Sequence, residues 1–182
     1  MFSLCLIFAG AAVLTFLGYL FYLGLFAPVK VEAKTVGPLF LVYRSEKGDY
    51  RHTGKTVGEL VRDMQSIGAG EVKGFAIYYD DPKKVNAADL RSDVGVVLQD
   101  KDRQRAAGIL QNYQTKEFPA LEGAVCSFQL KNTFSVFLGS YKVYPKLVKF
   151  VEERGMAPQY TLEIYDFGRS TTYFMPFSEQ KL

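Results

Sequence analysis

Residues 57–78 read VGELVRDMQSIGAGEVKGFAIY, and residues 144–165 read YPKLVKFVEERGMAPQYTLEIY. An offset of 87 residues aligns the two segments without gaps and makes five of their 22 positions identical. In each segment apolar residues recur at helical spacing, a glycine follows as a stop signal, and the closing stretch is typical of a strand. Internal duplication explains these identities better than coincidence, which stays the alternative. The identical pairs are Leu60 and Leu147, Val61 and Val148, Gly68 and Gly155, Ile77 and Ile164, and Tyr78 and Tyr165.

Extending outward from the repeat predicts the order strand, helix, strand, strand in both halves of the chain. A capping box at Thr56 and Glu59 favours a helix start in the first half, and Pro145 favours one in the second. Two such units predict an α+β fold with two antiparallel sheets, each carrying its helix on one face, that meet at a shared cleft. The predicted strands are residues 39–43, 75–80 and 94–98 in the first half, and residues 124–130, 160–165 and 172–177 in the second.

One domain therefore covers residues 38–182, with halves at about 38–98 and 123–177. The connector between the halves, residues 99–122, is polar and contains a weak amphipathic helical pattern. A connector of this kind lets the second copy pack beside the first.

The N-terminal segment has a different composition. Residues 4–27 read LCLIFAGAAVLTFLGYLFYLGLFA, and no charged side chain occurs before Lys30. Twenty-four helical residues are about 36 Å long, enough to cross a hydrocarbon core of about 30 Å. We therefore expect a transmembrane helix, a signal-anchor, within residues 1–29, followed by a juxtamembrane linker at 30–37 and a cytosolic domain. A cleaved signal peptide is the weaker alternative, because no basic residue precedes the apolar run.

The composition excludes several classes of function. The 182-residue chain has 22 Lys and Arg against 19 Asp and Glu, and its net charge of +3 provides no basic patch for direct contact with nucleic acid. One histidine, His52, and two cysteines are too few for a zinc site. The sequence also contains no phosphate-binding loop, HExxH motif or GxSxG motif. We therefore expect a protein without metal, cofactor or catalytic activity.

Six short motifs follow one another along the chain. They are Gly48-x-Tyr50, YYDDP at 78–82, VG at 94–95, VYPxL at 143–147, LEIY at 162–165 and YFM at 173–175. The first is similar to a turn of GyrI-like domains, the effector-binding modules also found in bacterial multidrug regulators. The set as a whole resembles the animal testis-expressed ER-phagy receptor family, in which one N-terminal membrane span precedes a cytosolic GyrI-like domain.

This resemblance implies a protein of the endoplasmic reticulum membrane that also reaches the autophagosome and the nuclear envelope. The family acts in ER-phagy, the autophagic turnover of the endoplasmic reticulum, by binding autophagosomal ubiquitin-like proteins. It also recruits the p97 ATPase and assists the repair of topoisomerase–DNA adducts. In the family the autophagy and p97 contacts depend on a long acidic tail, whereas this sequence stops at Leu182. The expected role is therefore that of a tailless receptor or adaptor.

One internal segment fits the autophagy-binding pattern of an aromatic residue followed, after two positions, by an aliphatic one. Phe118-Pro119-Ala120-Leu121 has this spacing, with Glu117 before it and Glu122 after it. Such a motif joins the edge of the partner's sheet as an extra strand. Because the segment lies in the predicted connector, we expect Phe118 and Leu121 to be exposed, with burial of both in the core as the alternative.

The resemblance also implies a cleft between the halves, where bacterial GyrI-like modules hold cationic or aromatic compounds. Glu163 and Tyr165 share one face of their predicted strand, and Tyr78 and Tyr79 lie on the equivalent strand of the first half. A carboxylate among tyrosines suits a small cation by its charge and by the ring faces. The alternative is a solvated Glu163 with tyrosines in the core. A third interpretation is hydrolysis, with Glu163 and Tyr78 as base and acid.

Overall fold

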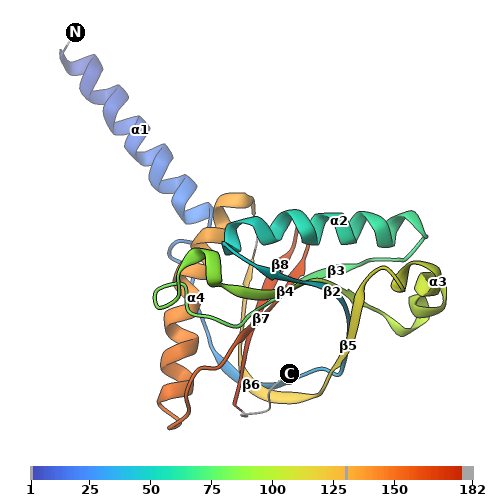
Figure 1. Ribbon diagram of the computed structural model, residues 1–182. Helices are drawn as coiled ribbons and strands as arrows, with labels where there is room; N and C mark the ends of the chain where they lie inside the picture. Colours follow the sequence, from blue (N-terminus) through green and yellow to red (C-terminus); the bar gives the residue numbers. More distant parts are fainter. Residues whose placement is uncertain (1, 130, 178–182) are drawn as a thin grey trace.

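A single curled sheet of eight antiparallel strands, in the form of a half-barrel, makes up most of the protein (Figure 1). The computed structural model describes residues 2–129 and 131–177, without the side chains of residues 2–6 and 133. Along the sheet the strands follow the order β1-β6-β8-β7-β3-β4-β2-β5. The strands are β1 (Glu32–Val36), β2 (Leu39–Lys47), β3 (Lys73–Tyr78), β4 (Arg91–Leu98), β5 (Gln114–Phe118), β6 (Leu121–Gln129), β7 (Thr161–Asp166) and β8 (Ser170–Pro176). The helices are α1 (Phe2–Tyr22), α2 (Thr53–Ser66), α3 (Asp100–Leu110) and α4 (Thr133–Glu152), with short 3-10 turns at Tyr50–His52 and Ala87–Asp89.

The order strand, helix, strand, strand is present in both halves. β2, α2, β3 and β4 form the first unit, and β6, α4, β7 and β8 form the second. The two aligned glycines follow their helices in the same way: φ is +74° at Gly68 and +72° at Gly155, a left-handed conformation that favours glycine. The units meet at β3 and β7, which pair antiparallel in the middle of the sheet.

The expectation of two separate sheets is wrong, because both units belong to one continuous sheet. Ala76 in β3 lies directly opposite Glu163 in β7, and the hydrogen-bond ladder continues through this pair from one unit to the other. The predicted linking segments also contribute strands: β1 lies within residues 30–37 and pairs with β6, and β5 lies within residues 99–122 and pairs with β2. Hydrophobic patterning does not reveal these edge strands, since most of their residues are exposed or only partly buried.

The two faces of the sheet have different neighbours. α2 and α4 cover one face, where Leu60 and Met64 of α2 pack with Val96 of β4. Leu147 of α4 packs with Tyr173 of β8 on the same face. The opposite, concave face is filled by its own side chains, so strand alternation decides which residues can meet. The fully buried residues of that concave cluster are Leu41, Phe75, Ile77, Phe118, Leu162 and Phe174.

α4 begins about three turns earlier than the sequence predicts. Asn132 Oδ1 accepts a hydrogen bond from the Ser135 amide at 3.1 Å, and the Ser135 hydroxyl accepts one from the Asn132 amide at 3.0 Å. This reciprocal capping box places the first residue of the helix at Thr133, so Pro145 lies inside the helix. The predicted start of the second helix at Pro145 is therefore wrong.

α2 also begins before its predicted capping box. Its first residue is Thr53, and the Thr56 hydroxyl donates to the Glu46 carboxylate of β2. The tertiary contact with β2 takes the place of the local cap that the sequence suggested.

α1 ends before the predicted apolar helix does. The chain turns after Tyr22, where Gly24 has φ +86° and Leu23 is buried. Of the helices within residues 2–129 and 131–177, none combines the length and apolar character needed to cross a membrane. The expectation of a transmembrane helix within residues 1–29 is therefore corrected.

Candidate functional site

Glu163 is a buried carboxylate at the seam between the two halves. It lies in β7 on the face that the helices cover, and only 4% of its surface is exposed. Its Oε1 accepts a hydrogen bond from the Tyr144 hydroxyl of α4 at 2.7 Å, and its Oε2 accepts one from the Tyr165 hydroxyl at 2.7 Å. Within the described part of the chain, no cationic side chain pairs with it.

A chain of hydroxyl groups continues from the carboxylate towards α2. The hydroxyl oxygens of Tyr165 and Tyr78 are 3.1 Å apart, and the Tyr78 oxygen is 3.2 Å from Thr53 Oγ1. Because Tyr165 donates its proton to Glu163, its oxygen is free to accept one from Tyr78. The ring of Tyr50, with its centroid 4.5 Å from that of Tyr78, extends the aromatic wall.

Burial controls the protonation of this cluster. Removal from water raises the pKa of Glu163 above its usual 4.5, although the hydrogen bonds from Tyr144 and Tyr165 act in the opposite direction. Burial also raises the pKa of both tyrosines, and the adjacent Glu163 charge adds to the increase. The tyrosines therefore stay protonated donors. An ionised Glu163 without a counter-charge is costly in this environment.

Two more hydroxyl groups on this face have no hydrogen-bond partner among the described residues. Tyr173 lies opposite Glu163 in the β7–β8 ladder, and Thr171 lies opposite Tyr165. Both side chains are fully buried, and neither hydroxyl is paired. Since buried hydroxyl groups are normally paired, these two are available to a ligand that enters the site.

The tyrosines around Glu163 are less buried than the carboxylate. Tyr78, Tyr144 and Tyr165 are partly exposed over the whole residue, although their hydroxyl groups lie beside the buried Glu163. The structure brings together three of the four predicted cleft residues, Tyr78, Glu163 and Tyr165, and buries the carboxylate instead of solvating it.

Tyr79, the fourth predicted cleft residue, lies on the opposite face of the sheet. Successive residues of a strand point to opposite faces, so Tyr78 and Tyr79 cannot line the same cleft. The Tyr79 hydroxyl donates to Asp93 Oδ2 at 2.7 Å, and Lys116 Nζ donates to the same oxygen at 2.7 Å. The expectation for Tyr79 is therefore corrected: it belongs to a separate polar cluster on the concave side.

The predicted docking motif is part of the hydrophobic core. Phe118 is fully buried and meets Phe174 edge to face, with the ring centroids 6.2 Å apart. Leu121 is 8% exposed and belongs to the same cluster. The expected exposure of Phe118 and Leu121 is wrong, because β5 pairs with β2 and directs Phe118 into the half-barrel.

Comparison with known families gives the same assignment of fold. Residues 30–173 match the family described as a GyrI-like small molecule binding domain. This chain belongs to the GyrI-like family. The matched region contains Glu163 and all the tyrosines that surround it.

Two curated relatives are similar to this GyrI-like chain. Testis-expressed protein 264 of Homo sapiens is 29% identical over 160 residues, which cover 84% of this chain and 50% of the relative. The Mus musculus homolog is 28% identical over 152 residues, which cover 79% of this chain and 48% of the relative. The chain therefore spans about half the length of the curated relatives that it matches.

Solved structures share the GyrI-like fold at low identity. The EcmrR C-terminal domain has a TM-score of 0.53 at 12% identity, covering 81% of this chain and 96% of that chain. SAV2435 bound to tetraphenylphosphonium has a TM-score of 0.52 at 10% identity, with coverages of 82% and 94%. A hydrolase from Listeria innocua has a TM-score of 0.51 at 15% identity, with coverages of 82% and 92%. At these identities the similarity concerns the fold alone.

Sequence reasoning misses three members of the GyrI-like site. Tyr144 escapes notice because the predicted helix starts one residue after it; its spacing to Leu147 and Val151, three and seven residues on, would place it on the sheet-facing side. Tyr173 could have been found by pairing β7 with β8. Thr53 carries no signal in the sequence, since its role depends on where α2 begins.

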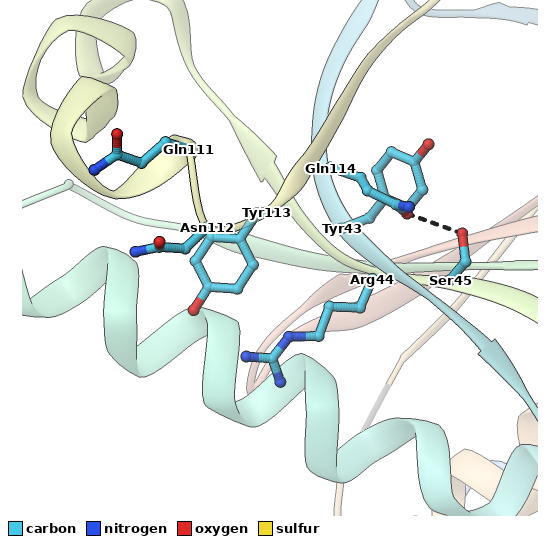
Figure 2. A pocket seen from close by; sticks show the side chains of 7 residues that line it. All are labelled: Tyr43, Arg44, Ser45, Gln111, Asn112, Tyr113 and Gln114. Carbon is cyan, nitrogen blue, oxygen red and sulfur yellow. Dashed lines mark hydrogen bonds between the residues drawn. The ribbon is translucent and has the colours of Figure 1, made fainter.

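A second candidate is a shallow polar groove at the β2–β5 edge of the sheet (Figure 2). Its volume is about 490 Å³. The Ser45 hydroxyl donates to Gln114 Oε1 at 3.0 Å, and the Arg44 guanidinium lies 5.2 Å from the Tyr113 ring while it pairs with Glu59. These groups already satisfy one another, so the groove offers a ligand less than Glu163 does.

Proposed function

We propose that this GyrI-like protein binds a small organic cation at Glu163. The observation that carries the proposal is a buried carboxylate, held by two tyrosine hydroxyls at 2.7 Å, with no cationic partner among the described side chains. A bound cation supplies the missing counter-charge, and the rings around it offer their negative faces. The match to a small-molecule-binding family supports a ligand of this size.

Cation binding and protonation are coupled at this site. Because its pKa is raised, Glu163 in the free protein keeps its proton to a higher pH than a solvated glutamate does, whereas a cation favours the carboxylate. Protons and the cation therefore compete for the same group. The affinity for the cation rises with pH until Glu163 is ionised in the free protein as well.

The ligand reaches the carboxylate by displacing side chains. Tyr144 belongs to α4, whereas Tyr78 and Tyr165 belong to the sheet, so a rotation of Tyr144 or a small shift of α4 uncovers Glu163. The unpaired hydroxyl groups of Thr171 and Tyr173 then become available to polar groups of the ligand.

Calorimetric titration with tetraphenylphosphonium tests this proposal. The probe is suitable because a protein of the same fold is described as bound to it. Glu163→Gln should weaken binding about 30-fold or more, since loss of one partner from a buried charge pair costs about 2–5 kcal/mol. The matched control, Glu152→Gln, removes the same charge from an exposed position at the end of α4 and should bind as the wild type does.

One outcome would refute the site at Glu163, and another would refute cation binding itself. Equal affinity of wild type and Glu163→Gln would show that the cation binds elsewhere. No binding of tetraphenylphosphonium or of smaller lipophilic cations at pH 8 would remove cation binding as the function.

We also propose a second function, that of an adaptor in turnover of the endoplasmic reticulum. The 29% identity to Testis-expressed protein 264 supports it, because motifs of this chain resemble those of the ER-phagy receptor family. β5 is an edge strand of the sheet, and an edge can pair with a strand of an autophagosomal ubiquitin-like protein even though Phe118 is buried.

A binding assay between the full chain and autophagosomal ubiquitin-like proteins tests the adaptor function. Glu117→Lys reverses an exposed charge on β5, at the cost of its ion pair with Arg103 of α3, and it should abolish binding if this edge is used. Glu152→Lys, on α4, is the control for charge. Failure of the wild type to bind would refute the adaptor proposal and leave cation binding untouched.

A further inference from the structure

Three aromatic side chains form an exposed stripe on α4. Phe134, Phe137 and Tyr141 are spaced at i, i+3 and i+7, and 58%, 63% and 81% of their surfaces are exposed. At this spacing they lie on one face of the helix, away from the side that packs on the sheet. An exposed group of large aromatic residues of this kind marks a surface that contacts a protein or a membrane.

The charge around the stripe has a single sign. Residues 131–151 contain four lysines and no aspartate or glutamate. Lys131 and Lys146 are exposed, and Lys149, further towards the end of α4, is exposed and pairs with Glu153 at 3.7 Å. Aromatic rings combined with lysines suit a layer of anionic lipid headgroups, where the rings enter the boundary and the ammonium groups meet phosphate or carboxylate.

The stripe is continuous with other exposed aromatic residues at the base of α1. Asn132 Nδ2 donates to the Tyr19 hydroxyl at 2.9 Å, and Lys131 Nζ lies 5.7 Å from the Tyr22 ring. Lys142 Nζ donates to the carbonyl of Gly24 at 2.7 Å, which fixes this junction to α4. Figure 1 shows the base of α1 beside the start of α4, at the end of the molecule from which α1 projects.

We propose that the stripe of Phe134, Phe137 and Tyr141 rests on an anionic lipid surface, with α4 lying against the headgroups rather than crossing them. The occupant is a bilayer and not a protein groove, because the exposed aromatics extend over two elements and the charges beside them are all basic. This contact would hold the seam between the halves, which includes Tyr144 of the same helix, close to the membrane.

The absence of tryptophan from the sequence permits a direct test with the full chain. Phe137→Trp places a single tryptophan in the stripe. Met156→Trp places one at an exposed site beyond the opposite end of α4, which itself lies about 22 Å along the helix from residue 137. Vesicles of phosphatidylcholine with 30% phosphatidylserine should shift the emission of the first tryptophan to the blue, and brominated acyl chains should quench it, while the second remains unchanged. Adding Phe134→Ser and Tyr141→Ser to the first variant should reduce the shift at least twofold.

Each other result would overturn the proposal. An unchanged spectrum of Phe137→Trp with vesicles would exclude contact with lipid. Equal shifts of both tryptophans would indicate unfolding on the vesicle instead of docking by the stripe. A shift that depends on protein concentration and occurs without vesicles would assign the stripe to a second copy of the chain. An equal response to pure phosphatidylcholine would refute the role of the lysines.

Discussion

Replacing Glu163 with Gln should change the pH dependence of folding stability in one direction. Burial raises the pKa of Glu163 above its usual 4.5 in the folded protein, whereas the unfolded chain ionises near the usual value. Between these two pKa values, the unfolded chain releases a proton that the folded protein keeps. The stability contributed by neutral Glu163 is therefore complete below about pH 4.5 and is lost as the pH rises through the folded pKa.

The magnitude follows from the single proton involved. Within that window the wild type loses at most about 1.4 kcal/mol of unfolding free energy per pH unit, and the Glu163→Gln variant lacks this loss. The unfolding free energy of Glu163→Gln minus that of the wild type should therefore rise with pH at up to that slope and then become constant. Replacement of the carboxyl by an amide also changes the hydrogen bonds with Tyr144 and Tyr165, by about 1 kcal/mol, but this part does not depend on pH.

Urea unfolding followed by circular dichroism, at intervals from pH 4 to pH 8, measures this difference. Glu152→Gln is the control, since it makes the same substitution at an exposed position at the end of α4. A flat curve for Glu163→Gln would refute the argument that desolvation outweighs the two hydrogen bonds. If the unfolding free energy of Glu163→Gln minus that of the wild type falls with pH, the hydrogen bonds from the tyrosines outweigh burial and lower the pKa of Glu163.

Four further changes test the fold. Gly155→Val should lower the unfolding free energy by at least about 1 kcal/mol, because φ is +72° there, whereas Gly58→Ala inside α2 meets no atom within 4 Å and should raise it by about 0.5–1 kcal/mol; chemical denaturation compares the two. Phe118→Ala should cost about 3–5 kcal/mol by the same assay, and a cost below 1 kcal/mol would contradict its burial. Gly139→Ala should lower the melting temperature and cost about 1–3 kcal/mol, since its Cβ would lie 2.8 Å from the Tyr173 hydroxyl; unchanged melting would show that the packing adapts.

The predictions from sequence succeed where a pattern is local and fail where pairing is distant. Gly68 and Gly155 are recognisable because a helix stop needs only its own neighbours in the chain. The strands β1 and β5 carry no such pattern, since pairing with β6 and β2 rather than burial creates them. Phe118 shows the same contrast between local pattern and distant pairing. Its motif suggests an exposed residue in a connector, but the pairing of β5 with β2 buries it.

The residues of the candidate site could be predicted only in part from the sequence, for a related reason. Glu163 and Tyr165 could be placed on one face from strand alternation, and the same rule separates Tyr78 from Tyr79. Tyr144 required the true start of α4, which depends on the capping box of Asn132 with Ser135. No pattern in the sequence reports that a carboxylate is buried without a cation, because that property belongs to the assembled seam.

The duplication explains why the site contains one acid and a pair of tyrosines. Tyr78 and Tyr165 are equivalent in the two copies, and their hydroxyl groups meet at 3.1 Å across the seam. The same offset of 87 residues relates Glu163 to Ala76, which lies directly opposite it in the β3–β7 ladder. Side chains opposite each other in such a ladder have Cβ atoms about 4.5–5.5 Å apart, so an acid in both copies would place two buried carboxyl groups in contact. Hydroxyl groups can be duplicated at this centre because each can donate and accept, whereas two carboxyl groups in contact could not both be ionised. A symmetric frame of tyrosines with one acid is thus favoured here, and that single acid is the group to which we propose that a cation binds.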